Sequence, residues 1–495
     1  MSLRNKTITG LAWTFGQQFS VQAINFIVQL VLARILGPEA FGLIAMIMVI
    51  MVIGNTLSDS GLASSLIRTK DVSEKDYSTV FILNVGFSVW IYGVIYFFAP
   101  ILSSFYQETQ LTDVVRLFSL SIVIRSLTIV QTTKLTKELN FRKQMIAQVP
   151  SVLIGGICGV VFAYWGFGVW SLVYMNLIQV SIFSVLIWLI TNWKPTLIFD
   201  KEICKRHFLF GYKLTISALM HSLYTNLYVI LIGRFYSPQQ VGYYTQADNL
   251  RIFPARQTTN AVDKVTYPIF SKVQDDPEKL RSIYRSVTQQ IVFWLTPLMC
   301  CLMLIAEPLF FLLLTDAWEG AILYFQILCV SAVMYPLTVY NLNILNVKGR
   351  SDLVLRIAIV KYIISIIGIF SLYSFGVIYL VWFQFIITFI NFFINGYFSG
   401  KIIEYPALRQ FNDIVLYYVL GIAIGLILLY CGSVLFATFS ISERSWLALL
   451  IKSSFFFLLY FGLSFLFRFR PLFESYKIAK DFTNNRSDHE KNINN

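Results

Sequence analysis

Two similar stretches, LARILGPEAFG at residues 32–42 and IGRFYSPQQVG at residues 232–242, decide how this chain of 495 residues is organised. Three positions match at a separation of 200 residues: Arg34 with Arg234, Pro38 with Pro238, and Gly42 with Gly242. Proline interrupts a helix and glycine allows a tight turn, so each stretch predicts a sharp turn between two helices. The recurrence of the turn indicates an internal repeat.

Long apolar runs extend outward from both turns and continue through most of the chain. Hydrophobic residues make up 57% of the sequence and charged residues only 13%, with 44 Phe and 27 Tyr. Soluble domains carry about 25% charged residues. The composition therefore disfavours a cytosolic enzyme, a nucleic-acid-binding module or a secreted disulfide scaffold, and it favours an all-α integral membrane protein.

Fourteen apolar runs are long enough to cross a bilayer, which takes about 20 helical residues. We predict spans at residues 10–33, 40–66, 79–105, 114–133, 145–164, 169–190, 214–233, 240–269, 286–314, 321–345, 357–373, 377–398, 414–437 and 446–467. The least apolar is 240–269, which contains five charged residues. We still predict a span there, because the chain must cross the membrane once between the apolar runs on either side.

The distribution of basic residues orients these spans. With the N-terminus in the cytoplasm, 29 of the 39 Lys and Arg residues fall in cytoplasmic segments, and four lie in outer loops or, for Arg116, at the outer end of the span 114–133. This asymmetry follows the positive-inside rule and predicts that both termini are cytoplasmic. It also explains the net charge of +13 without a nucleic-acid partner.

The repeat unit contains six predicted spans, an even number, so both copies have the same orientation in the membrane. We predict two pseudo-symmetric six-helix bundles at residues 1–200 and 201–400, two extra transmembrane helices within 401–467, and a cytoplasmic tail at 468–495. Transporters built from such repeats bind substrate between the halves and alternate access to the two sides.

Several classes of site are not expected. The loops are too short for a folded soluble domain, and the sequence contains no P-loop or Rossmann fingerprint. The six Cys residues lack metal-ligand spacing and are interpreted as small apolar side chains. The basic N-terminus leads into a span rather than a cleaved signal peptide. We therefore expect no cofactor, no metal and no enzymatic activity.

Charged residues inside the predicted spans are the first candidates for function. With Arg116 counted at the outer turn, six are basic and four acidic: Arg125, Arg251, Arg256, Lys264, Lys361 and Lys452, with Asp59, Asp248, Asp263 and Glu307. A charge at the bilayer centre costs at least about 2.5 kcal/mol. This number of charges predicts either a water-filled cavity or close pairing.

Polar residues also recur at helical spacing, which places them on common helix faces. The first span carries Gln18, Gln22, Asn25 and Gln29; the seventh carries Ser217, His221, Tyr224 and Tyr228; the eighth carries Thr245, Asn249, Arg256, Thr259 and Asp263. The second span adds Asn55 beside Asp59, and the fourth adds Ser121, Thr128 and Thr132 around Arg125. Several other spans are far more uniformly apolar, as lipid-facing helices are.

These residues define a candidate substrate-binding set and a candidate ion-coupling set. The substrate-binding set is Arg125, Arg251, Arg256, Gln18, Gln22, Asn25, Gln29, His221, Tyr224 and Asn249, and the ion-coupling set is Asp59, Asp248 and Asp263. Arg125 and Arg256 are the strongest candidates because each lies in the middle of a span. A guanidinium suits a phosphate because its planar fork bonds two oxygens and stays charged.

Structural interpretations of the same residues stay open. The four amides of the first span can form hydrogen bonds to neighbouring helices instead of lining a transport pathway. Arg251, Lys264 and Lys452 can lie near span ends and extend toward the interface. Asp248 can pair with Arg251 one turn away, and His221 can be an ordinary core histidine.

Several segments resemble the polysaccharide transporters of the multidrug/oligosaccharidyl-lipid/polysaccharide exporter superfamily, and most closely the colanic-acid-exporter type of lipopolysaccharide or O-antigen biosynthesis protein. They are LARILGPEAFGLIAM (32–46), SDSGLASSLIRTKDVSEKDYSTVFILN (58–84), FGVWSLV (167–173), IGRFYSPQQVGYYTQADNL (232–250) and YPIFSKVQDD (267–276). The resemblance covers about the first 280 residues, and beyond them only the pattern of spans is similar.

The resemblance implies a multi-pass flippase of a bacterial inner membrane. It would move a polyprenyl-diphosphate-linked oligosaccharide from the cytoplasmic to the periplasmic leaflet by alternating access, coupled to an H⁺ or Na⁺ gradient. Its partners would be membrane lipids and a polysaccharide polymerase or ligase. The family's cationic central cavity is matched here by Arg251 and Arg256, whereas the first span carries amides and no arginine.

Three other functions are alternatives to a flippase. A multidrug cation antiporter on the same fold is the main alternative, and it would use Asp59, Asp248 and Asp263 to hold cationic drugs. A membrane-embedded polymerase or ligase is disfavoured by the short outer loops. A non-transporting scaffold is disfavoured by the charges inside the spans.

Overall fold

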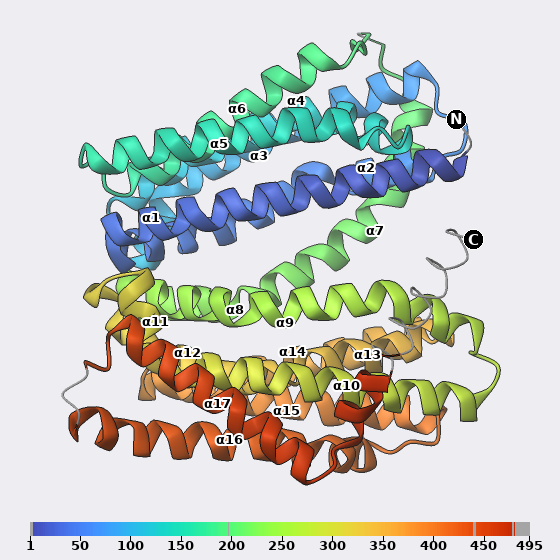
Figure 1. Ribbon diagram of the computed structural model, residues 1–495. Helices are drawn as coiled ribbons and strands as arrows, with labels where there is room; N and C mark the ends of the chain where they lie inside the picture. The colour runs from blue at the N-terminus through green and yellow to red at the C-terminus, as the bar shows by residue number, and fades with distance from the viewer. Residues whose placement is uncertain (1–2, 197, 439–441, 478–479, 481–495) are drawn as a thin grey trace, which may run out of the picture. The chain divides into compact units, whose positions relative to one another are not determined.

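The computed structural model describes residues 3–196, 198–438, 442–477 and 480; for residues 3–12 and 433–438 only the backbone is described. The remainder of the predicted tail, residues 478–479 and 481–495, lies outside the described residues. Within these ranges the regular structure is entirely helical (Figure 1). The all-α fold class predicted from composition is therefore confirmed.

The helices follow the chain in the order labelled in Figure 1. Up to residue 272 they are α1 (Leu3–Asp59), α2 (Leu62–Arg68), α3 (Glu74–Tyr106), α4 (Leu111–Lys137), α5 (Phe141–Tyr164), α6 (Trp170–Ile190), α7 (Lys201–Thr225), α8 (Leu227–Phe235) and α9 (Pro238–Lys272). After it come α10 (Pro277–Leu304), α11 (Ala306–Leu313), η1 (Asp316–Trp318), α12 (Glu319–Ala332), α13 (Tyr335–Val347), α14 (Ser351–Leu372), η2 (Tyr373–Phe375), α15 (Val377–Ile402), α16 (Ala407–Thr438) and α17 (Trp446–Leu466).

Both repeated turns break the helix at the predicted place. Helix α1 is interrupted at Gly37, whose φ of 72° and ψ of −177° are not helical, and it resumes at Pro38. In the second copy α8 ends at Phe235 and α9 begins at Pro238. Each proline thus starts a helix, where its missing N–H leaves no bond unmade.

Each predicted span overlaps a helix or two consecutive helices. Four ranges expected to be single spans are each divided between two helices: 40–66 between α1 and α2, 214–233 between α7 and α8, 286–314 between α10 and α11, and 321–345 between α12 and α13. Pro308 and Pro336 lie in the first turns of α11 and α13, which accounts locally for two of the breaks. By contrast, α9 continues through Pro254 without ending.

Ten helical segments of the described chain are long and apolar enough to cross a membrane, or eleven if the bent pair of α7 and α8 is one crossing. The two helices differ in direction by 48°. This count treats α1 as a single segment and leaves out α4 and α9, the helices whose ranges contain Arg125 and Arg256. The chain is therefore a multi-pass membrane protein.

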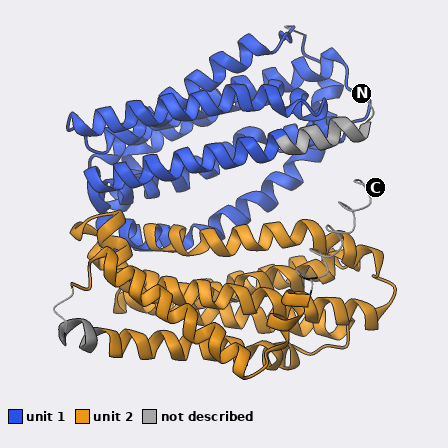
Figure 2. Ribbon diagram, in the orientation of Figure 1, with its two compact units in different colours: residues 1–245 blue, residues 246–495 orange. Residues whose placement is uncertain are grey.

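The chain divides into two compact units, residues 1–245 and 246–495, coloured separately in Figure 2. In unit 1, α5 packs along α6 and α1, and α3 along α4. Three glycines of α5 allow this close approach. A Cβ at Gly155 would lie 2.8 Å from the Cβ of Gln179, and one at Gly156 would lie 2.6 Å from Val28 Cγ2.

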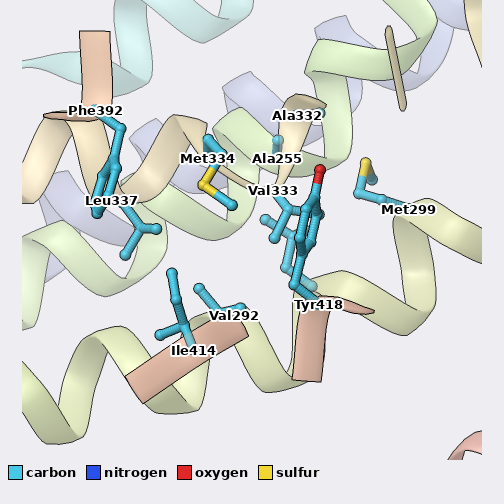
Figure 3. Close-up of a cluster of buried hydrophobic side chains, with 11 residues drawn as sticks. Ala255, Val292, Met299, Ala332, Val333, Met334, Leu337, Phe392, Ile414 and Tyr418 are labelled. Carbon is cyan, nitrogen blue, oxygen red and sulfur yellow. The ribbon is translucent and has the colours of Figure 1, made fainter. Parts of the chain in front are cut away.

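Unit 2 is held by α10, which packs against α16 and α12, and by α13 against α15. Figure 3 shows one buried cluster where these helices meet: Ala255, Val292, Met299, Met334, Phe392 and Tyr418 are among its members. The hydroxyl of Tyr418 donates to the carbonyl oxygen of Val330 at 2.8 Å, so its polar atom is satisfied inside the apolar cluster.

Candidate functional site

A pocket of about 450 Å³ lies inside unit 1, between α1, α4, α5 and α6. Its lining contains one cation and one acid, Arg125 and Asp59, together with the amides of Asn55, Gln148 and Gln179. The other lining residues are Val52, Thr56, Ser58, Ile122, Thr128, Ile129, Thr132, Val180 and Phe183. The structure thus brings the two charged residues predicted for the second and fourth spans to one pocket.

Small residues bring the lining helices together. A Cβ at Gly54 would lie 2.7 Å from Ile122 Cδ1, so the Ile122 side chain would have to shift to admit a larger residue between α1 and α4. Gly54 directly precedes Asn55 on α1, and Ile122 is one turn before Arg125 on α4. On the other side Gly155 of α5 admits Gln179 of α6. The packing of two glycines therefore holds the polar residues of four helices around one space.

The guanidinium of Arg125 has no hydrogen bond or ion pair to any residue that the structure describes. Neighbouring hydroxyls are occupied within their own helix: Thr128 Oγ1 donates to the carbonyl of Arg125 at 2.8 Å, and Thr132 Oγ1 to that of Thr128 at 3.0 Å. The side chain is exposed to the pocket rather than buried between helices. All of its N–H donors remain available to an anion.

Asp59 lies at the end of α1, where its Oδ1 accepts the backbone N–H of Ala63 at 3.3 Å. It forms no ion pair with Arg125 or with any other cation of the described chain. The pocket therefore holds an acid and a base that do not neutralise each other, an arrangement suited to a site whose charge changes when a ligand or proton binds.

Gln148 and Gln179 are site residues that the sequence analysis missed. Gln148 is the one amide of the span 145–164, and Gln179 shares the span 169–190 with Asn176 one turn away. An amide in an apolar span is a usable signal, but the face it occupies depends on how α5 and α6 pack.

The candidates on α9 in unit 2 separate into paired and unpaired residues. Arg251 is 7% exposed, and its Nη2 and Nε lie 2.6 and 3.0 Å from Asp248 Oδ1. The same oxygen accepts Gln384 Nε2 at 3.2 Å. Asp263 accepts a hydrogen bond from Asn343. The pairing of Asp248 with Arg251, left open by the sequence, is present.

Arg256 and Asn249 lie on the same helix but are exposed, and the Arg256 guanidinium bonds to no described residue. Arg125 and Arg256 are thus alike: the guanidinium of each forms no hydrogen bond or ion pair with a described residue. Lys361 is 3.5 Å from Asn395 Oδ1, and Lys452 is 2.9 Å from Glu443. Arg251 and Lys452 are both buried, and each pairs with a carboxylate, Asp248 and Glu443 respectively.

The remaining candidates lie outside the pocket lining. Gln18, Gln22 and Gln29 are exposed along one side of α1, and Asn25 is half-buried there. On α7, His221 is exposed and Tyr224 half-buried. Neither the polar residues of α1 nor those of α7 named here lie in the pocket between α1, α4, α5 and α6.

A different histidine forms the most extensive polar network of unit 1. His207 is fully buried; its Nδ1 lies 2.7 Å from Ser65 Oγ and its Nε2 3.1 Å from Asp76 Oδ1. Arg206 also pairs with Asp76. The network joins α2, α3 and α7. Sequence reasoning did not find it, because its members are 11 and 131 residues apart.

The pocket can bind a ligand that is anionic at one point and polar over a wider surface. A guanidinium with free donors suits phosphate oxygens, and amides and hydroxyls suit a polyol. Phe183 adds an aromatic surface. No group of three metal-ligand side chains occurs in the part of the chain that the structure describes.

The sequence matches a known family model, that of the polysaccharide biosynthesis proteins, over residues 31–323. The lipopolysaccharide biosynthesis protein WzxC of Escherichia coli strain K12 is 26% identical over 73% of this chain and 74% of its own. The teichuronic acid biosynthesis protein TuaB of Bacillus subtilis strain 168 is 23% identical over 86% of this chain and 89% of its own.

The fold is similar to that of a solved membrane protein, the lipid II flippase MurJ in an inward closed conformation. The TM-score is 0.69 with 14% sequence identity, and the similarity covers 92% of this chain and 99% of the other. An inward-facing multidrug resistance transporter of the MATE family and the MOP superfamily gives a TM-score of 0.55 with 17% identity, over 83% of this chain and 95% of the other.

Proposed function

Because this chain belongs to the polysaccharide biosynthesis protein family, we propose that it is a flippase for a polyprenyl-diphosphate-linked oligosaccharide. It moves this substrate from the cytoplasmic to the periplasmic leaflet by alternating access. The resemblance stated from the sequence is confirmed at the level of the family. So is the prediction that the chain is not an enzyme, since one relative is a succinoglycan biosynthesis transport protein and the fold neighbours are a flippase and a multidrug resistance transporter.

The observation that carries the proposal is the unpaired Arg125 in a pocket lined by three amides. A diphosphate is a dense anion, and burying it near hydrocarbon requires a cation that is not already neutralised. The amides supply donors and acceptors for sugar hydroxyls. Arg256 adds a second unengaged guanidinium in unit 2, and Arg251 contributes through its pair with Asp248.

The exposed polar stripes are assigned to the same pathway. Gln18, Gln22, Asn25 and Gln29 on α1, with His221, Tyr224 and Asn249, provide amide, imidazole and phenol groups that a glycan can contact as it moves. Asn25 and Tyr224 are half-buried, but the other five are exposed, and this exposure supports the role over helix-to-helix attachment, which would bury them.

We assign ion coupling to Asp59 first among the three candidate acids. Asp248 is engaged by Arg251 and Gln384, and Asp263 by Asn343, whereas Asp59 accepts only one backbone N–H. An acid in the pocket of the substrate cation can link proton or Na⁺ binding to release of the anion. A polysaccharide polymerase or ligase is the expected protein partner.

For the topology we propose fourteen crossings with both termini in the cytoplasm of a bacterial inner membrane. Three crossings are added to the eleven identified by length and hydropathy: α1 is divided at Gly37, and α4 and α9 cross despite their charges. The repeat divides the chain at 1–200, 201–400, 401–467 and 468–495, although α7 packs on α1, α2 and α3 of unit 1.

The test is a deletion strain complemented with the full chain or with Arg125→Ala. We expect the deletion to accumulate lipid-linked oligosaccharide and lose surface glycan, and Arg125→Ala to behave like the deletion. Arg116→Ala on the same helix is the matched control, because Arg116 lies 3.9 Å from Asp113 and outside the pocket lining. Normal glycan display by Arg125→Ala at wild-type protein level contradicts the proposal.

A multidrug cation antiporter is the second candidate function, supported by the similarity in fold to a multidrug resistance transporter. It would require acids to hold the drug, and the pocket has a single acid beside an unpaired arginine. Drug-sensitivity profiles of the deletion strain separate the two: the antiporter predicts hypersensitivity to cationic drugs with normal surface glycan.

A further inference from the structure

A second cavity, of about 660 Å³, lies within unit 2 and is unconnected with the residues proposed above to bind the oligosaccharide. It is formed by the first turns of α10, by the segment that connects α15 to α16, and by the start of α16. Four arginines line it: Arg281, Arg285, Arg409 and Arg470. Ser282 and Asn412 add smaller polar groups.

Three carboxylates line the cavity with the arginines, Glu278, Glu404 and Asp413, so they balance the charge only in part. Asp413 holds Arg285, with Nη2 and Oδ1 2.7 Å apart, and it also accepts the hydroxyl of Tyr405. The contact between Arg281 and Glu404 is loose, at 3.8 Å. These pairs leave donors of Arg281 unused.

The other two arginines are freer. Arg470 donates from Nε to Glu474 at 2.6 Å, which leaves its two terminal nitrogens for other acceptors. Arg409 is exposed and has no ion pair or hydrogen bond to a described residue. The cavity therefore presents one fully available guanidinium beside two that are partly available.

The cavity lies at the level where the helices enter the hydrocarbon. Its residues on α10 and α16 immediately precede or overlap the starts of the predicted spans 286–314 and 414–437. One and two turns beyond Asn412, on the same face of α16, Leu416 and Val419 are 60% and 52% exposed. A polar cavity thus continues into a lipid-facing apolar stripe.

We propose that this cavity binds the phosphate group of an anionic membrane phospholipid, whose acyl chains lie along the exposed face of α16. Arginine forks bind phosphate oxygens in pairs, and basic pockets at the ends of transmembrane helices are suited to lipid head groups. The lining has four arginines and three carboxylates, and the guanidinium of Arg409, which pairs with no described residue, favours a lipid with net negative charge. The continuity with Leu416 and Val419 favours a lipid over a soluble phosphate.

The test uses purified full-length protein in detergent with an equimolar mixture of phosphatidylglycerol and phosphatidylcholine, and native mass spectrometry to count bound lipids. Wild type should retain phosphatidylglycerol preferentially. Arg409→Gln should weaken that retention about tenfold, the scale of one charge-assisted hydrogen bond. Arg281→Gln, measured in the same way, should also weaken it.

Arg356→Gln is the matched control, because Arg356 is an exposed arginine of unit 2 that forms no hydrogen bond or ion pair with a described residue and lies outside the cavity lining. It should retain the lipid as wild type does. The proposal is overturned if Arg409→Gln and Arg281→Gln both bind like wild type, or if Arg356→Gln loses as much lipid as they do. Elution volume and thermal midpoint establish that each variant is folded.

A competition arm distinguishes the two sources of phosphate. Excess inorganic phosphate should leave bound phosphatidylglycerol in place, because it lacks the acyl contacts with α16. If inorganic phosphate displaces the lipid and its own binding depends on Arg409, the cavity is a site for soluble phosphate and the lipid assignment is wrong. Glycan export is not the readout, so the result is independent of the proposed flippase activity.

Discussion

Gly42 packs directly against the carbonyl group of Pro238: a Cβ added to Gly42 would lie 1.7 Å from that oxygen. The contact is reciprocal, because a Cβ at Gly242 would lie 2.0 Å from the carbonyl oxygen of Pro38. The two copies of the repeated turn thus pack backbone to backbone, which explains why glycine and proline recur 200 residues apart.

Alanine at Gly42 or Gly242 should destabilise the protein, because neither carbonyl can move without displacing the first turn of a helix. Overpacking of this kind costs about 1–3 kcal/mol, so the thermal midpoint of the purified protein should fall. Gly93→Ala in α3 is the control, since no atom lies within 4 Å of its added Cβ. Equal midpoints for Gly42→Ala and Gly93→Ala would argue against the contact.

His207→Ala should also lower stability, because it leaves the buried Ser65 and Asp76 without their shared partner. An unsatisfied buried polar group costs about 1–3 kcal/mol. His221→Ala on the same helix is the comparison, and its midpoint should change little because His221 is exposed. Equal thermal midpoints for His207→Ala and His221→Ala would show that the network does not stabilise the fold.

Arg251 and Arg256 should behave differently although they are neighbours on α9. Arg251→Ala removes the buried partner of Asp248 and should reduce stability by roughly 1–3 kcal/mol. Arg256→Ala should leave the midpoint and membrane insertion unchanged while surface-glycan export is lost. Export at wild-type level by a stable Arg256→Ala protein would show that Arg256 does not take part in transport.

Asp59→Asn should uncouple transport from the ion gradient, because the amide is isosteric but cannot take up a proton or neutralise Na⁺. We expect glycan export by this variant to be slow and insensitive to collapse of the proton or sodium gradient. Asp413→Asn, which is outside the pocket of Arg125, should keep the gradient dependence. Wild-type sensitivity in Asp59→Asn would assign coupling to another group.

The sequence was sufficient for the helices and for both repeated turns, because these depend on local properties. Apolar length sets a span, and Gly37 with Pro38 sets a break. The breaks inside 286–314 and 321–345 were not predicted, although prolines mark them, because Pro100, Pro150 and Pro297 lie within continuous helices. Whether a proline ends a helix depends on the packing around it.

The sequence predicted the charged residues of the candidate site, but it did not predict that they line one pocket. Arg125 and Asp59 stood out because a charge in a span is costly. Their common pocket depends on contacts between helices distant in sequence, such as Gly54 of α1 with Ile122 of α4. For the same reason Gln148, Gln179 and the buried His207 could not be assigned before the packing was known.

The most direct test of the central claim measures which leaflet holds the lipid-linked oligosaccharide. In vesicles from the complemented deletion strain, wild type and Arg116→Ala should place it on the periplasmic side. Arg125→Ala, at equal protein level, should leave it on the cytoplasmic side as the empty strain does. Wild-type transfer to the periplasmic leaflet by Arg125→Ala would contradict the account.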